Sequence, residues 1–268
     1  MLNFEQNTVE DLLPAEWLVY EQPLTERVRT FLRLEFLFEE CSHHLGLTSA
    51  WNSRAAISAL LEISALLTRG DVRTEVLKEL ERCLLFLGRL QDSPEVDGGR
   101  LQSVLGELET LRRAMNGDGR PLGLGLKENE FLNTIKNRAA IPGGTCQFDL
   151  PLYHTWLTQP HARRMRDLQH WLDEIRPLRD TINLLMALTR ESALPSREVA
   201  EQGMYLRMFD TPICPLVRVM VPVNSGVYPE ISAGRQRITI HFLEPNPADG
   251  RPQQAKRDIS FKLVCCQL

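Results

Sequence analysis

The stretch QRITIHFLE, residues 236–244, alternates between apolar and polar side chains, which is typical of a β-strand with one buried face. The alternation returns at 203–210, 215–223 and 257–266, and residues 228–232 could add a short strand. Turn-forming linkers such as PVNSGVYP and PNPADGRPQQ separate these stretches. We therefore predict an antiparallel sheet, joined by hairpins, in the C-terminal part of the chain.

The preceding residues have apolar side chains at helical spacing instead. Capping residues and prolines divide them into helices expected at about 25–41, 49–69, 72–87, 97–115, 127–139, 161–175 and 178–192. Helices first and strands last predict an α+β protein rather than alternating β-α-β units. We expect residues 1–19 to form an N-terminal extension without fixed structure, 20–195 an α-helical domain that dimerises, and 196–268 an antiparallel β-sheet domain.

The composition of the chain disfavours several classes of function. The 268 residues include 31 Lys and Arg against 35 Asp and Glu, so the net charge is −4. This balance disfavours a basic nucleic-acid coat and a polybasic membrane anchor, and no apolar run of about 18 residues occurs. The acidic N-terminus lacks the basic segment followed by an apolar segment that is typical of a signal peptide. The six cysteines are scattered along the chain, which is not the pattern of a disulfide framework. We expect a reduced, cytoplasmic protein.

The predicted strands place positive charge on their polar sides. Residues 201–268 contain 8 basic and 6 acidic residues, a net charge of +2, which leaves 23 against 29, or −6, for the remainder. Strict alternation expects the apolar sides to include Met204, Leu206 and Met208 on the first strand. The cations on the polar sides are Arg207, Arg218, Arg237, His241 and Lys262. The face is either simply solvated or a docking surface for an anionic peptide or a nucleic acid.

Catalytic signals are weak. No phosphate loop, dinucleotide fingerprint, G-x-S-x-G or H-E-x-x-H motif is present. Cys146 precedes His154 by eight residues, so a hydrolase with a Cys/His pair is one alternative, but a turn followed by a buried cysteine explains the segment better. Cys265 and Cys266 are adjacent on a strand and point to opposite faces, which disfavours a shared metal. We expect no enzyme, no cofactor and no metal.

A nucleic-acid-binding module is the other alternative, with the cationic face as its binding surface. Such a module needs aromatic side chains interleaved with the charges for base stacking. By strand alternation, only Tyr205 and Phe209 lie on the same side as the cations.

Five blocks, in order, resemble the ZapD (YacF) family of bacterial cell-division proteins. They are YEQPLTERVRTFLRLEFLF (20–38), RGDVRTEVLKELER (69–82), IPGGTCQFDLPLYHTWL (141–157), YPEISAGRQRITIHF (228–242) and FKLVCC (261–266). The resemblance implies a homodimer, with a helical domain and a β-domain, that binds the C-terminal tail of FtsZ. It implies that the dimer bundles FtsZ filaments, stabilises the Z-ring at mid-cell and lowers FtsZ GTPase activity indirectly.

The family's tail site is a positively charged pocket between the helical and strand portions. The matching residues here are Arg33, Arg69, Arg73, His154, Arg235, Arg237 and His241. Arg237 and His241 are also the pair that strand alternation places on the polar face. An alternative role for Arg69 and Arg73 is to compensate the partial charges at helix ends, and for Arg33 it is to form a surface ion pair. The resemblance implies no nucleic-acid and no membrane partner.

Overall fold

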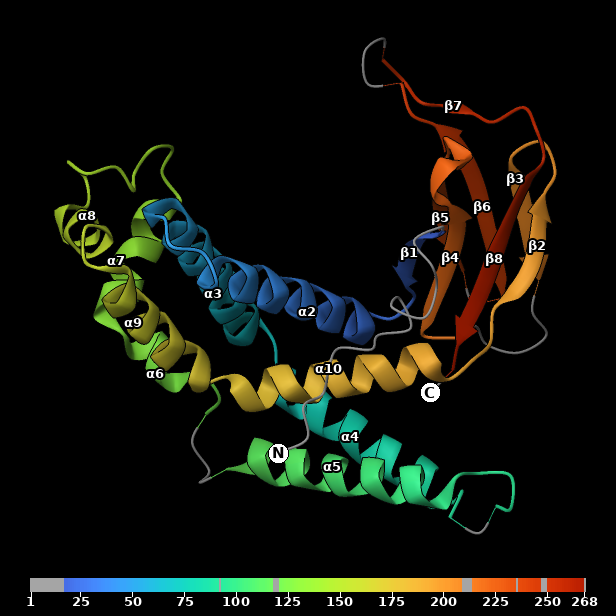
Figure 1. Ribbon diagram of the computed structural model, residues 1–268, viewed down its shortest axis with the longest axis horizontal. Helices are drawn as coiled ribbons and strands as arrows, with labels where there is room; N and C mark the ends of the chain where they lie inside the picture. The colour runs from blue at the N-terminus through green and yellow to red at the C-terminus, as the bar shows by residue number, and fades with distance from the viewer. Residues whose placement is uncertain are drawn as a thin grey trace. The chain divides into compact units, whose positions relative to one another are not determined.

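The computed structural model describes residues 17–91, 93–117, 121–208, 214–234, 236–246 and 250–267. It confirms the α+β class, with helices followed by antiparallel strands (Figure 1). The chain divides into a helical unit, residues 30–185, and a β-unit, which combines residues 17–29 with 186–267. Most of the expected N-terminal extension, residues 1–16, lies outside the described residues.

The helices begin and end close to the predicted boundaries. Thr25 caps the first through a bond that its hydroxyl accepts from the Val28 amide, and Asp71 accepts from the Thr74 amide. The short α6 and α8 were not predicted. The helices are α2 (Glu26–Leu45), α3 (Ala50–Arg69), α4 (Val72–Gly88), α5 (Gly98–Asn116), α6 (Leu124–Glu128), α7 (Glu130–Ala139), α8 (Pro151–Leu157), α9 (His161–Asp173) and α10 (Arg176–Glu191).

The helical unit buries one apolar stripe from each long helix. Leu34 of α2, Leu60 of α3 and Leu80 of α4 are fully buried, as the 3.6-residue spacing predicts. The helices α4 and α5 pack against each other (Figure 1). A second cluster consists of aromatic rings from α7, α8 and α9, in which Phe131 stacks on Trp171 with centroids 5.7 Å apart. Trp171 is buried in this cluster.

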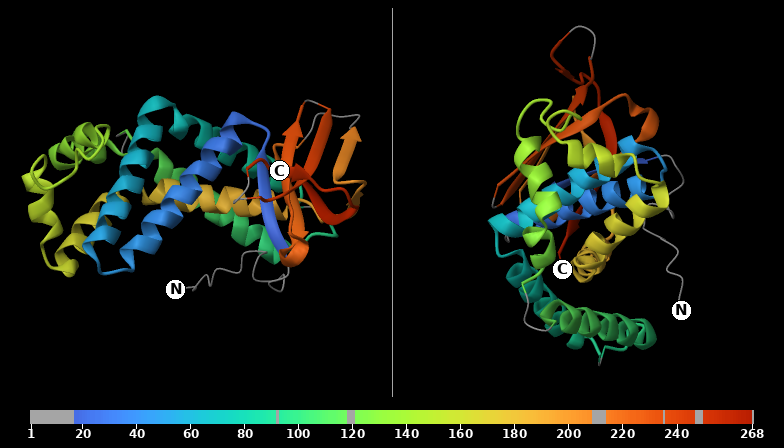
Figure 2. Two further views of the ribbon diagram at one scale, coloured as in Figure 1. Left: turned by 90° about the horizontal axis from the view of Figure 1, so that it is seen from above. Right: turned by 90° about the vertical axis from the view of Figure 1, so that its left-hand side faces the viewer.

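The β-unit consists of two antiparallel sheets rather than the one sheet predicted. One sheet has the order β1-β4-β8-β2; the other has the order β3-β6-β5, with β7 also paired to β6. The blue β1 lies beside β4 at the edge of its sheet (Figures 1 and 2). The strands are β1 (Trp17–Pro23), β2 (Ser196–Ala200), β3 (Met204–Met208), β4 (Leu216–Pro222), β5 (Tyr228–Ala233), β6 (Arg237–Glu244), β7 (Gln253–Gln254) and β8 (Ile259–Cys266).

The core of the β-unit is formed by alternate side chains from both sheets. Val219 of β4, Ile240 of β6 and Phe261 of β8 belong to one buried cluster, and the rings of Phe242 and Phe261 lie 5.0 Å apart. Two sheets packed face to face form a β-sandwich. The predicted alternation of β6 and β8 is therefore confirmed.

The phase of β3 is the reverse of the prediction. Tyr205 points inward and meets Phe261 edge to face, with ring centroids 5.1 Å apart. Met204, Leu206 and Met208 are 43%, 53% and 66% exposed. The expectation that these three side chains face the core was therefore wrong.

The corner between β2 and β3 sets the position of β3 beside β6. Gly203 has φ +73°, and its carbonyl accepts a hydrogen bond of 2.8 Å from the Phe242 amide. A Cβ atom at this position would lie 2.4 Å from the Ala255 carbonyl oxygen. Only glycine therefore fits both the backbone conformation and the close approach.

An ion cluster joins β1 to the rest of the β-unit. Arg190, near the end of α10, donates two hydrogen bonds of 2.9 Å to the Glu21 carboxylate on β1. The Arg218 Nε atom of β4 lies 2.8 Å from the same carboxylate, and the Arg218 side chain is only 4% exposed. The geometry of this second contact is that of an ion pair rather than an aligned hydrogen bond. Burial alone would raise the pKa of Glu21, but the hydrogen bonds and charge of Arg190, and then Arg218, hold it below its ordinary value.

Candidate partner-binding face

One face of the β3-β6-β5 sheet points away from the sandwich core. Residues directly opposite each other on antiparallel strands lie on the same face. The pairs Met204–His241, Leu206–Thr239 and Met208–Arg237 therefore place the exposed apolar residues of β3 beside the polar residues of β6. We call this surface, with Glu230 and Ser232 of β5, the outer face.

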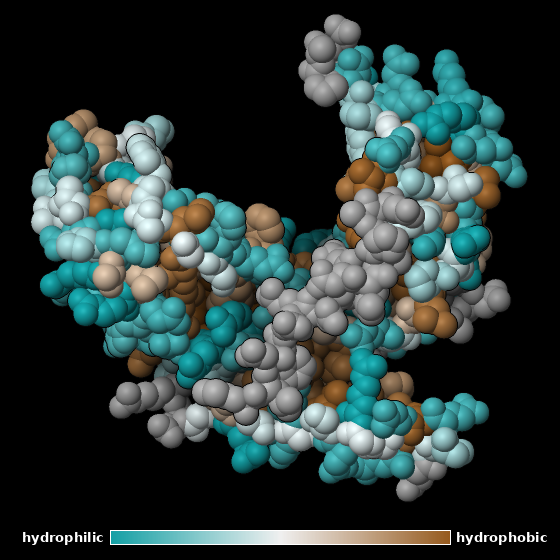
Figure 3. Space-filling view, in the orientation of Figure 1, coloured by the Kyte–Doolittle hydropathy of each residue, from teal (hydrophilic) through white to brown (hydrophobic). Residues whose placement is uncertain are grey.

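The outer face combines exposed apolar area with positive charge. Arg237 is exposed and His241 is half-buried, next to the row of Met204, Leu206 and Met208. Apolar residues also reach the surface of the β-unit among hydrophilic ones on the side shown in Figure 3. Large apolar side chains that stand together on a solvent-facing sheet surface are typical of an interaction site. A partner that supplies both apolar side chains and carboxylates would complement this surface.

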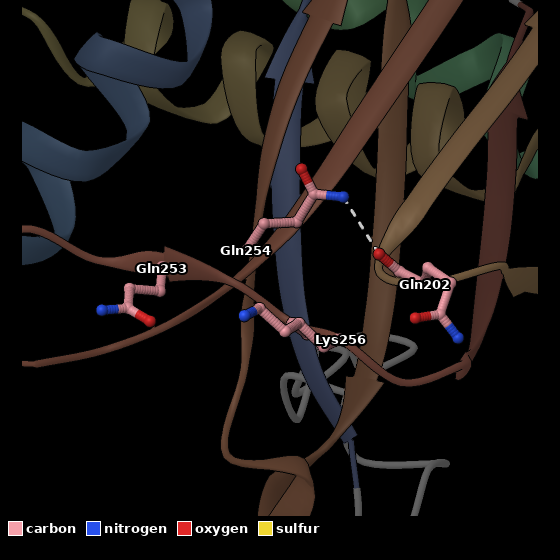
Figure 4. A pocket seen from close by; sticks show the side chains of 5 residues that line it. Gln202, Gln253, Gln254 and Lys256 are labelled. Carbon is pink, nitrogen blue, oxygen red and sulfur yellow. Dashed lines mark hydrogen bonds between the residues drawn. The ribbon is translucent and has the colours of Figure 1, made fainter.

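His241 is oriented by a short polar chain at one end of the outer face. Its Nδ1 atom lies 3.4 Å from the Gln254 side-chain oxygen, and the Gln254 amide donates a bond of 3.0 Å to the Gln202 carbonyl. Gln202, Gln254 and Lys256 line a shallow depression here (Figure 4). Glu230 faces His241 across the strand pair, so the charge at this end is mixed.

The other cations do not join Arg237 and His241, which corrects the expectation of one shared cationic face. Arg218 is buried against Glu21 on the other sheet. Lys262, also on that sheet, lies over the Trp17 ring at 4.2 Å from its centroid. Arg207 alternates with the exposed residues of β3 and approaches Glu198 of β2 at 3.4 Å. Each of these three cations interacts with a residue on another strand. Alternation within a single strand does not show which residues of other strands lie nearby.

The remaining predicted site residues have different surroundings. Arg33 on α2 and His154 on α8 are exposed side chains of the helical unit. The Arg73 guanidinium donates to the carbonyls of Met115 and Asn116, at 3.1 and 2.9 Å, and so binds the C-terminal end of α5, as its alternative role predicts. The Arg69 side chain and all of Arg235 lie outside the described residues. That the seven residues line one pocket stays a prediction.

The helical unit has an exposed apolar surface of its own, which the sequence analysis missed. The Arg54 guanidinium lies 5.4 Å from the Trp51 ring centroid and donates to the Thr145 carbonyl at 2.8 Å. Trp51 is 77% exposed, and Phe148 and Leu152, which follow Thr145 closely in the chain, are 81% and 59% exposed. We call these three residues the aromatic surface. Apolar residues in the block 141–157 are the one signal that could have indicated it.

The alternative functions have little structural support. Cys146 contacts Asp149, with 3.7 Å between Sγ and Oδ2, rather than His154. Tyr205 points inward, which removes an expected base-stacking group, and Phe209 lies outside the described residues. Among the described residues, no group of three or more His, Cys, Asp or Glu side chains could hold a metal ion. In the same part of the chain, no helix combines the length and apolar character needed to cross a membrane.

Comparison with known proteins gives consistent matches along the chain. The sequence profile of the ZapD family, described as "Cell division protein", matches residues 32–241. Cell division protein ZapD of Methylococcus capsulatus is 39% identical over 252 residues, which cover 94% of this chain and 98% of the relative. The proteins of the same name from Azoarcus sp. and Coxiella burnetii are 38% and 37% identical over 93% and 95% of this chain, and each match covers 99% of the relative.

Proposed function

Because this chain belongs to the ZapD family of cell division proteins and acts in cell division, we propose that its partner is the C-terminal tail of FtsZ. A homodimer with two tail sites cross-links and bundles FtsZ protofilaments and stabilises the Z-ring. Bundling lowers the GTPase activity of FtsZ indirectly, because the dimer does not act at the nucleotide. The protein works in the cytoplasm at mid-cell and needs no cofactor.

The outer face is the observation that carries this proposal. A short tail with carboxylates and a few apolar side chains matches a surface on which Arg237 and His241 stand beside an exposed row of Met204, Leu206 and Met208. Arg237 takes a carboxylate through charge-assisted hydrogen bonds, and the apolar row binds the tail's apolar side chains. Arg33, Arg69, Arg73, His154 and Arg235 are the further tail-binding residues of the proposal.

The affinity of one site should be modest. Ordering a flexible tail consumes part of the interaction free energy, so we expect a Kd of roughly micromolar for each site. Two sites on one dimer raise the apparent affinity for a filament bundle, since the second contact is intramolecular. The charge contribution weakens as ionic strength rises.

Dimerisation is assigned to the helical unit. The aromatic surface of Trp51, Phe148 and Leu152 supports this assignment, because a second copy would bury large side chains that are now exposed. Phe148→Asp should therefore convert the dimer to a monomer that binds the tail peptide but does not bundle filaments. Analytical ultracentrifugation measures the first effect, and an unchanged dimer would contradict the assignment.

Co-sedimentation with FtsZ polymers tests the tail site. Arg237→Glu should lower tail-peptide affinity at least about tenfold, because a charge-assisted bond contributes roughly 1.5–3 kcal/mol, and should abolish bundling. Arg251→Glu is the matched control, since it makes the same charge change at an exposed residue outside the strands that form the outer face. Normal bundling by folded Arg237→Glu, or equal losses in both variants, would refute the tail site.

A second variant tests the apolar row separately. Leu206→Asp removes apolar area and adds a negative charge at a side chain that is already 53% exposed, so the fold should tolerate it. We expect loss of tail binding with an unchanged circular dichroism spectrum. Retained binding would limit the tail site to the charged residues.

A further inference from the structure

Two cysteines of the β-unit contact each other through their side chains. Cys214 lies just before β4, and Cys265 lies on β8 opposite Val217 of β4. Both pack against the same buried cluster, and a hydrogen bond joins their side chains. Cys214 is 3% exposed, whereas Cys265 is partly open to solvent. A small reagent therefore meets Cys265 first.

The neighbouring Cys266 differs in its surroundings. It is fully buried on the opposite side of β8, where its charged neighbours are Arg218 and Glu21. Burial raises the pKa of Cys266 to about 11, so it remains a thiol at neutral pH. The two adjacent cysteines are thus a reactive residue and an internal control.

The groups around Cys265 favour its thiolate. The hydrogen bond from Cys214 lowers the pKa of Cys265 below that of an ordinary thiol, against the effect of burial, and the Arg207 guanidinium adds to the lowering, while Glu198 opposes it. The pKa of Cys214 is raised by the same hydrogen bond and by burial, so it keeps its proton. A thiolate beside a protonated thiol is the arrangement in which one sulfur attacks and the other resolves.

We propose that Cys214 and Cys265 are an oxidisable pair that a hydroperoxide converts into an intrachain disulfide. The Cys265 thiolate attacks the terminal peroxide oxygen, the O–O bond breaks, and Cys265 becomes a sulfenic acid as hydroxide (or alkoxide) leaves and takes up a proton. The Cys214 sulfur then attacks the Cys265 sulfur, the S–O bond breaks, and hydroxide leaves with the Cys214 proton as water. With hydrogen peroxide, two thiols and one peroxide yield one disulfide and two waters.

The disulfide would tie the segment before β4 to the end of β8. This link closes the loop between residues 214 and 265 and so restricts the unfolded chain. It is independent of the proposed tail site, since neither cysteine belongs to the outer face. Added dithiothreitol should reverse it.

Treatment of the full-length protein with hydrogen peroxide tests the pair. Thiol titration of the denatured protein should fall from six to four per chain. Non-reducing tryptic mass spectrometry should join peptide 208–218 to peptide 263–268, with the loss of two hydrogens. The C-terminal peptide contains both Cys265 and Cys266, so variants assign the linked sulfur.

The matched variants are Cys265→Ser and Cys266→Ser, each checked for its fold by circular dichroism. We expect the linked peptide in the wild type and in Cys266→Ser, and none in Cys265→Ser or Cys214→Ser. A linked peptide that persists in Cys265→Ser would overturn the proposal. So would six thiols retained by the wild type under conditions that oxidise a free cysteine peptide, or oxidation of Cys265 to sulfinic acid without a link.

Discussion

The ion cluster at Glu21 makes a strong prediction about the stability of the β-unit. Glu21→Gln preserves the shape of the side chain but removes the charge that faces Arg190 and Arg218. The Arg218 side chain is only 4% exposed, so its charge would lose its compensation in a place that water hardly reaches. Removal of one partner from a buried pair costs about 3–5 kcal/mol, and the 18% exposure of Glu21 favours the lower end of that range.

Hydrogen exchange of the β4 and β8 amides is the appropriate assay, because it reports on the β-unit alone. A loss of about 3 kcal/mol should speed exchange of the most protected amides at least about a hundredfold at pH 7. Glu244→Gln is the matched control in the same unit, since Glu244 is 51% exposed and lies 3.7 Å from an equally exposed Arg257. The control should change stability by less than about 1 kcal/mol. Equal effects of the two variants would refute the reasoning.

The same cluster predicts a dependence on pH. The pKa of Glu21 is lowered in the folded protein, so its contribution is complete above the ordinary pKa of a glutamate, about 4.5. The contribution is lost as pH falls below that value and through the folded-state pKa. The stability difference between wild type and Glu21→Gln should therefore be constant near neutral pH and shrink in acid. A difference that persists unchanged at pH 2 would show that packing, rather than charge, is the cause.

Further predictions concern single residues. Gly203→Ala should destabilise the β-unit by about 1–3 kcal/mol in urea unfolding, because its Cβ would meet the Ala255 carbonyl at a positive φ, and an unchanged midpoint would contradict this. Asp71→Ala should cost about 1 kcal/mol through the lost cap of α4, to be measured as faster amide exchange in its first turn. Arg73→Gln should loosen the end of α5 in the same assay, and unchanged exchange there would show that its bonds to the last carbonyls contribute nothing. Alkylation of Cys265 by iodoacetamide should reach its half-maximal rate at a lower pH than alkylation of an ordinary thiol, whereas an ordinary midpoint near pH 9 would contradict the thiolate.

Much of the fold follows from local sequence. The helices have caps such as Thr25 and Asp71, and β6 and β8 have a strict apolar alternation, so each carries its own signal. The strands β1 and β2 do not: WLVYEQP includes a glutamate that is half-buried only because Arg190 and Arg218 face it, and SREVA is short and mostly polar. Their pairing partners β4 and β8 are distant in the chain, and local periodicity contains no information about them.

The site was predictable only in part, for a similar reason. Alternation separated Arg237 from Ile238 correctly, but it could not tell which side of β3 faces the core, because methionine and leucine are compatible with either. The register of β3 against β6 resolves this, and it turns three expected core residues into the apolar half of the outer face. Arg218 shows the opposite error, since a charge on a strand predicts exposure unless its partner on another strand is known.

The place of β1 in the sequence has a consequence for synthesis on the ribosome. Trp17–Pro23 emerges before the helical unit, but the strand it pairs with, Leu216–Pro222, is made after the whole of that unit. At roughly 5–20 residues per second, the gap of about 200 residues leaves this apolar segment waiting for some 10–40 seconds with its backbone amides bonded only to water. The helical unit can fold during that delay. In the nascent chain this segment is thus open to proteases and mispairing for longer than the helices that follow it, since it is among the last to find its partner.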